Sequence, residues 1–156
     1  MAAWQVEFYI IPRRALASHG VLDSSDLAGT PWWTTHGLPA DYQKRLATVA
    51  PAGPSSSAEL ETWGSPDGNR VDVWSADGRV SAMMARVDVR RLDSKFGAAL
   101  IHFVRIAQAV LVRSDGLVVE PQIASYTAAL RSSDAWRFAS DPAAHFGGYD
   151  ANDDDP

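Results

Sequence analysis

The stretch that decides the fold is residues 59–90, ELETWGSPDGNRVDVWSADGRVSAMMARVDVR. Two turn signals divide it, SPDGN at residues 65–69 and DG at residues 77–78. Asp-Gly favours a tight hairpin because both central residues of that turn need positive φ. Between the turns, Val71 and Val73 alternate with polar or bulky neighbours, as in a strand with one buried face. The stretch therefore predicts a three-stranded antiparallel meander.

The alternation slips in the third strand of this meander. Val80, Ala82 and Met84 share one phase, whereas Val87 and Val89 share the other. An uncorrected slip would turn half of the apolar residues away from the core, so we expect a one-residue bulge near residues 83–85.

Upstream, residues 4–11 alternate as a first strand, which Pro12 ends because proline donates no ladder hydrogen bond. A long connection, residues 13–38, follows with a short helical turn expected at residues 23–28. Residues 40–49 carry an apolar stripe at helical spacing. The Pro-, Gly- and Ser-rich residues 50–58 predict an internal loop.

Downstream, Asp93 is placed to cap a helix, because its carboxylate can accept from the free N–H groups of the first turn. The apolar stripe of that helix is Phe96, Leu100, Phe103, Val104 and Ala107. Asp115-Gly116 then joins residues 109–114 and 117–120 in a hairpin that we expect to be buried on both faces. A last helix over residues 121–130 should turn Ile123, Tyr126 and Leu130 inward, and Ser133 or Asp134 should cap a further turn.

These elements predict an α+β fold with two layers, a mainly antiparallel sheet of about five to six strands with helices on one face. Residues 1–146 are expected to form a single domain and residues 147–156 an acidic, disordered tail.

Composition narrows the functional classes. The chain has 156 residues, a formal net charge of -5, six tryptophans and no cysteine. Without cysteine it has no disulfide and no thiolate metal site. The four histidines lack zinc-site spacing, so we expect no metal and no cofactor. The charge and the absence of strand aromatics in residues 80–90 argue against nucleic-acid binding. No apolar run could span a membrane, and we expect a cytoplasmic protein with no membrane partner.

The sequence offers little support for catalysis. Asp67, Asp77 and Asp115 are explained by their turns. Glu7, Asp72 and Asp88 should leave the non-core face of the sheet, where the ordinary expectation is ion pairing with Arg70, Arg86 and Arg90. An enzyme of undetermined class could use Glu7, His36 or Asp72, although no pair among them has a spacing that defines a reaction.

The remaining constellation is Trp32, Trp33, Trp63 and Trp74. The first two lie in the long connection, and Trp63 could approach Trp74 as a cross-strand pair. The connection could fold over the open sheet face and bury the tryptophans as a second small core. Alternatively, they could line an apolar groove or a dimer patch, because aromatic residues are enriched at the energetic centres of interfaces.

The best functional hypothesis is a non-catalytic module that binds another protein or a second copy of itself through these tryptophans. The alternatives are a small-ligand binding domain with an apolar tryptophan-lined pocket between the long connection and the sheet, and the small enzyme described above.

Overall fold

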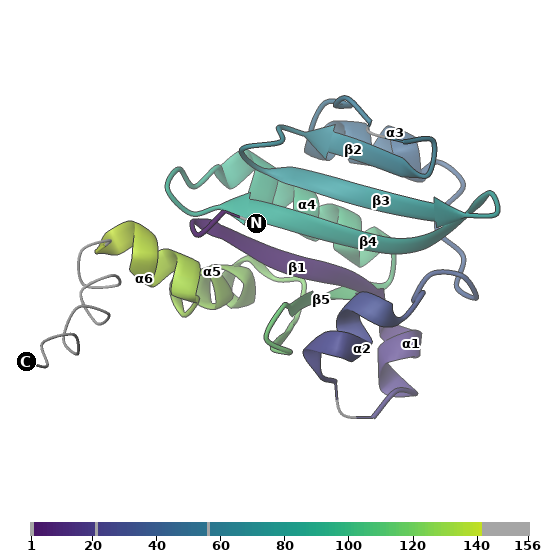
Figure 1. Ribbon diagram of the computed structural model, residues 1–156, viewed down its shortest axis with the longest axis horizontal. Coiled ribbons are helices and arrows are strands. Elements are labelled where there is room, and N and C mark those ends of the chain that lie inside the picture. The colour runs from purple at the N-terminus through teal and green to yellow at the C-terminus, as the bar shows by residue number, and fades with distance from the viewer. Residues whose placement is uncertain (1, 21, 56, 142–156) are drawn as a thin grey trace, which may run out of the picture.

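The computed structural model describes residues 2–20, 22–55 and 57–141, which form one six-stranded antiparallel sheet with helices packed on it (Figure 1). The strands are β1 (Gln5–Pro12), β2 (Leu60–Gly64), β3 (Arg70–Ala76), β4 (Arg79–Asp88), β5 (Ala109–Arg113) and β6 (Val118–Val119), in the order β2-β3-β4-β1-β5-β6. The predicted α+β fold class is confirmed. The predicted tail, residues 147–156, and the domain limit at residue 146 lie outside the described residues.

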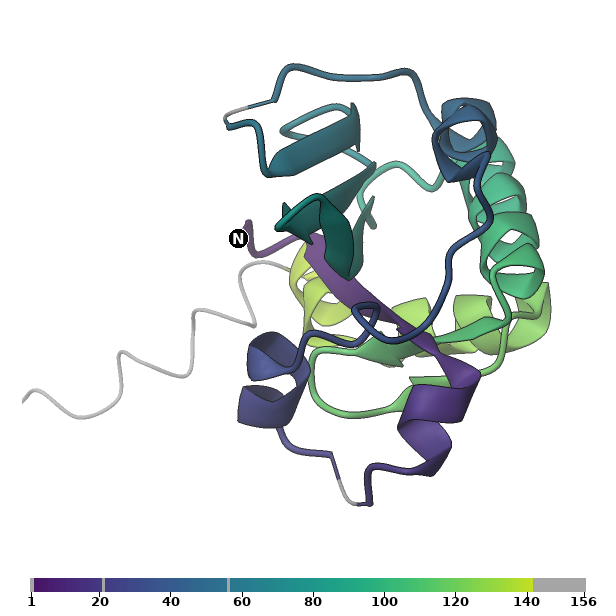
Figure 2. The same cartoon turned by 90° about the vertical axis from the view of Figure 1, so that its right-hand side faces the viewer.

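The helices are α1 (Arg13–Ala17), α2 (Ser24–Gly29), α3 (Tyr42–Val49), α4 (Ser94–Ile106), α5 (Ile123–Arg131) and α6 (Asp134–Ser140). Figure 2 shows α3, α4 and α5 together on one side of the sheet. We call that side of the sheet the core face and the other side the open face. Asp93 caps α4 as predicted, accepting from the N–H groups of Lys95 and Phe96, and the predicted apolar stripe of α4 is buried.

The meander forms as predicted, with its bulge in a different place. Asp77 and Gly78 have φ angles of 52° and 74°, the positive values that the tight turn needs. The register shifts between Trp74, which pairs with Ala82, and Ser75, which pairs with Val80, so Ser81 is the extra residue. The bulge therefore lies at Ser81 and not near residues 83–85.

Two hydrogen bonds accompany this position, and the first runs within the meander, from the hydroxyl group of Ser81 to the carbonyl oxygen of Trp74 at 3.2 Å. The carbonyl oxygen of Ser81 accepts a hydrogen bond of 3.0 Å from the N–H group of Trp33, in the long connection. After the bulge, the alternate residues Met83, Ala85 and Val87 all face the core.

Two expectations for the C-terminal part are wrong. The hairpin is buried on both faces only in β5, because β6 is an edge strand and Val118 is 45% exposed. Ile123, the first residue of α5, is 51% exposed, whereas Tyr126 and Leu130 are buried as predicted. Ser133 caps α6 through its hydroxyl group, which accepts from the N–H group of Trp136.

The long connection has more structure than its sequence suggested. The chain enters α1 directly after Pro12, and α2 follows over the predicted helical turn. Figure 2 shows α2 on the side of the sheet opposite α3 and α4, so this segment covers part of the open face. Leu27 of α2 is only 1% exposed.

The two edge strands of the sheet differ: a loop covers one, and the other is very short. Along β2, the loop after α3 forms bridges from Ala52 to Trp63 and from Ser57 to Leu60. The N–H group of Gly64 also donates to the carbonyl oxygen of Pro51 at 2.8 Å. The opposite edge is β6, which is two residues long.

Candidate functional site

Two of the four predicted binding residues are structural anchors. Trp32 is 5% exposed and Trp33 is 3% exposed, and both belong to the main core. The indole N–H group of Trp32 donates to the carbonyl oxygen of Leu27, and that of Trp33 donates to the carbonyl oxygen of Ile10 at 2.8 Å. Burial leaves these rings little surface for a partner, and their hydrogen bonds fasten the long connection to the sheet.

The other two tryptophans do not form the predicted cross-strand pair. Trp63 pairs with Val71, whose side chain faces the core, whereas Trp74 pairs with Leu60. Because successive side chains point to opposite faces, Trp63 lies on the core face and Trp74 on the open face. Trp74 is partly exposed there. A binding role for any of these residues stays a prediction, and Trp74 is the one whose placement favours it.

Trp74 lines a groove between the long connection and the sheet. The volume of this groove is about 410 Å³. Its floor comes from alternate residues of three strands, and its wall comes from α2 and the residues after it. The lining residues that we use below are Tyr9, Trp74, Ala82, Met84, Ala28 and Pro31. Burial and, second to it, the nearby Glu7 carboxylate raise the pKa of Tyr9 above its ordinary value.

A row of charged residues crosses the open face beside this groove, and the ion pairing expected from the sequence is confirmed. Nε of Arg86 lies 3.2 Å from Oε1 of Glu7, across strands. Nε of Arg70 donates to Oδ2 of Asp72 at 3.0 Å along one strand. Asp72 is 1% exposed, and its second carboxylate oxygen accepts from the hydroxyl group of Thr62. Both carboxylates therefore have cationic partners.

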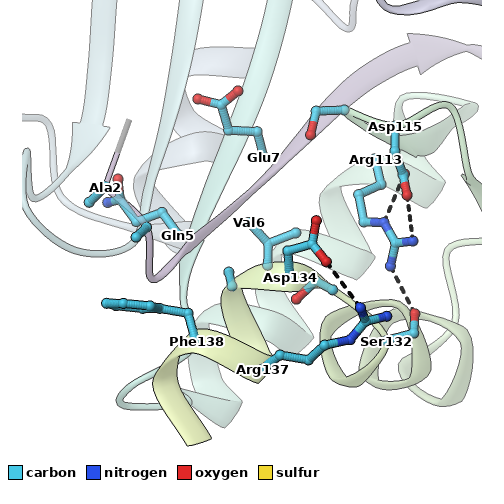
Figure 3. Close-up of a pocket in the computed structure, with 14 residues that line it drawn as sticks. Ala2, Gln5, Val6, Glu7, Arg113, Asp115, Ser132, Asp134, Arg137 and Phe138 are labelled. Carbon is cyan, nitrogen blue, oxygen red and sulfur yellow. Dashed lines mark hydrogen bonds and ion pairs between the residues drawn. The ribbon is translucent and has the colours of Figure 1, made fainter. Parts of the chain in front are cut away.

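A second cleft, of about 460 Å³, lies between β1, the β5–β6 turn and α6 (Figure 3). One of its cations, Arg113, forms hydrogen bonds through all three nitrogens of its guanidinium group. The guanidinium donates to both carboxylate oxygens of Asp115, at 2.9 and 2.7 Å, and to the carbonyl oxygen of Ala129 at 2.6 Å. Arg137 pairs with Asp134 at 3.3 Å, and Figure 3 shows Glu7 pointing away from both pairs. These contacts join the β5–β6 turn to α5 and hold α6 internally, which is a structural role.

The three side chains considered for catalysis do not meet. Glu7 lines the cleft of Figure 3, whereas His36 lines a separate cavity beside Trp33 and the β3–β4 turn. Nδ1 of His36 lies 3.2 Å from the hydroxyl group of its neighbour Thr35. Both oxygens of Asp72 are already bonded. Within residues 2–20, 22–55 and 57–141, no group of three His, Asp or Glu side chains is arranged to hold a metal ion.

A broad polar cleft of about 960 Å³ lies at the start of α4, and Asp88 and Arg90 line it. The guanidinium of Arg90 donates to both oxygens of Asp88, at 3.0 and 2.7 Å, and also stacks over Trp4, 4.0 Å from the ring centroid. The hydrogen bonds from Arg90 lower the pKa of Asp88 below its ordinary value.

This pair predicts an acid-dependent loss of stability. Because the pKa of Asp88 is lower in the folded protein than in the unfolded chain, its stabilising contribution is complete above the unfolded value of about 3.9. The contribution disappears as the pH falls through the folded pKa. Asp88→Asn should therefore be less stable than the wild type at pH 7, and the two unfolding free energies should converge once the pH lies below the folded pKa of Asp88. Urea titrations between pH 2 and 7 measure this, with Ser65→Ala in the same cleft as a control that does not titrate. A constant gap between wild type and Asp88→Asn at all pH values would contradict the assignment.

Comparisons of the chain with protein-family models, with curated proteins and with solved structures found no match. Among the described helices, none is both long enough and apolar enough to cross a bilayer.

Proposed function

We propose that this protein is a non-catalytic module that binds another protein, or a second copy of itself, through the open face of its sheet. The observation that carries the proposal is the groove lined by Trp74. There, the side chains of Trp74, Met84 and Tyr9 lie next to a row of charged side chains. An apolar centre with a polar rim is the usual anatomy of a protein interface. The separation of Glu7, His36 and Asp72 weakens the enzyme alternative.

A small apolar ligand is the second candidate for the same groove. Its volume of about 410 Å³ falls in the range typical of small-molecule sites, about 300–1,000 Å³. Tryptophan fluorescence during titration with a panel of metabolites distinguishes this candidate. A ligand should shift the emission of the wild type and leave that of Trp74→Phe unchanged.

The cytoplasmic location, expected because the sequence shows no signal-peptide pattern and no membrane-spanning run, is also part of the proposal, and fractionation of the source cells checks it.

Filling the groove should weaken protein binding. Ala28 is exposed on the wall of the groove, so Ala28→Arg adds a long side chain there without entering the core. Ala47 is exposed on α3, on the other side of the sheet, and Ala47→Arg is the matched control. We expect Ala28→Arg to weaken partner binding at least about tenfold, the loss of a single interface hot spot, and Ala47→Arg to leave it unchanged.

Two measurements check this expectation. Sedimentation velocity over a concentration series detects self-association, and quantitative affinity capture from source cells with the three proteins detects a different partner. A wild type that stays monomeric and retains no protein that Ala28→Arg loses would contradict the proposal.

A further inference from the structure

The charged row on the open face contains two arginines side by side. Arg70 of β3 and Arg86 of β4 are direct cross-strand partners, and their side chains are only 18% and 21% exposed. Like charges directly opposite each other destabilise a sheet. Glu7 compensates for Arg86 from the neighbouring strand β1, and Asp72 compensates for Arg70 from two residues further along β3.

The compensation of Arg86 is incomplete. Arg70 forms two hydrogen bonds, from Nε to Asp72 and from Nη1 to the carbonyl oxygen of Pro66. Nε of Arg86 lies 3.2 Å from the Glu7 carboxylate, but it is buried and has no hydrogen-bond partner among the described residues. Neither of its two Nη atoms donates a hydrogen bond to the part of the chain that the structure describes. Unlike Nε, these two atoms are not fully buried. A guanidinium held in place by the sheet thus presents unused donors at the surface.

Arg86 lies close to the groove on the same face of the sheet. Met84, in the groove floor, is two residues from Arg86 on the same strand and faces the same side. Two residues of a strand span about 7 Å. A guanidinium group carries two parallel N–H donors, and their spacing matches the two oxygens of a carboxylate. Glu7 and Asp72 beside it repel any anion, and they repel a doubly charged phosphate more strongly than a singly charged carboxylate.

We infer that Arg86, with Arg70 beside it, binds a carboxylate of the partner, and that the partner presents an Asp or Glu side chain about 7 Å from the apolar side chain that enters the groove. This inference rests on the proposed function and adds the chemistry of the partner to it. The partner segment is therefore acidic as well as apolar.

Selection of displayed peptides on the full-length protein tests this inference. Random dodecapeptides are selected on the wild type, and those that no longer bind Ala28→Arg are kept as groove-dependent. We expect these peptides to be enriched in Asp or Glu next to an aromatic or aliphatic residue. Replacing the acidic residue of a peptide by its amide should weaken binding to the wild type about tenfold or more.

A double-mutant cycle assigns the effect to Arg86. Arg86→Lys keeps a cation beside Glu7 but removes the fork, so it should weaken binding of the acidic peptide about tenfold or more and bind the amide peptide about as well as the wild type does. Arg79→Lys, at the β3–β4 turn, is the matched control and should bind like the wild type.

The outcomes separate the two proposals. Groove-dependent peptides that lack acidic residues, or that bind Arg86→Lys as tightly as the wild type, would overturn the carboxylate site and leave the protein-binding proposal standing. Recovering no groove-dependent peptide would overturn both. The amide peptides test the site on the unaltered protein, so the result holds even if Arg86→Lys folds poorly.

Discussion

Replacing Gly64 by alanine should destabilise the protein by about 3 kcal/mol or more, the range expected when a strained backbone position also clashes with its surroundings. Gly64 ends β2 with a φ of +116°, a value that side-chain-bearing residues rarely adopt. A Cβ atom there would lie 2.3 Å from the carbonyl oxygen of Asn69 and 2.9 Å from Cα of Arg70. Both are backbone atoms of the neighbouring turn and strand, so relief requires the hairpin itself to move.

Urea unfolding of Gly64→Ala measures this loss, and Gly29→Ala is the matched control. Gly29 ends α2 without a positive φ, and a Cβ atom there would meet nothing within 4 Å. Alanine should be neutral there or stabilising by up to about 1 kcal/mol, because it lowers the entropy of the unfolded chain. Equal stability changes in the two variants would show that the β2–β3 hairpin does not have this backbone conformation.

Asp72→Ala should cost about 3–5 kcal/mol, the usual effect of breaking a buried ion pair. Asp72 is 1% exposed and accepts hydrogen bonds from Thr62 and Arg70. Its removal leaves the mostly buried Arg70 facing Arg86 without a counter-charge, and it leaves the buried hydroxyl group of Thr62 without its acceptor.

The matched control for this prediction is Asp134→Ala. Asp134 also pairs with an arginine, Arg137, but the two side chains are 86% and 70% exposed. Exposed pairs contribute little, so urea titration should show a change below about 1 kcal/mol. A loss for Asp72→Ala no larger than that of the control would mean that the charged row on the open face is not held by Asp72.

The elements that local chemistry specifies could be predicted from the sequence. Asp77-Gly78 specifies its turn through positive φ angles, and Asp93 specifies the start of α4 through its carboxylate. The bulge could be anticipated from the slipped alternation, but its position could not. The bulged residue Ser81 accepts a hydrogen bond at its carbonyl oxygen from Trp33, almost fifty residues earlier. Such a long-range contact has no signature in the local pattern.

The candidate site was less accessible to prediction than the fold. The sequence indicated that Trp74 leaves the core side and that Glu7 and Asp72 share a face with arginines. It could not show that Trp63 and Trp74 lie on opposite faces, because this depends on the β2–β3 register. The role of Arg86 depends on which donors its neighbours leave unused, and only the three-dimensional arrangement of Glu7, Arg70 and Arg86 determines that.

The covered edge of β2 has a consequence for the behaviour of the protein at high concentration. Ala52 and Ser57 occupy the positions that a strand of another molecule would take, and the opposite edge offers only the two residues of β6. Sheets that end in this way resist edge-to-edge polymerisation into fibrils. Any ordered assembly of this protein should therefore be joined through a face of the sheet and not through its edges.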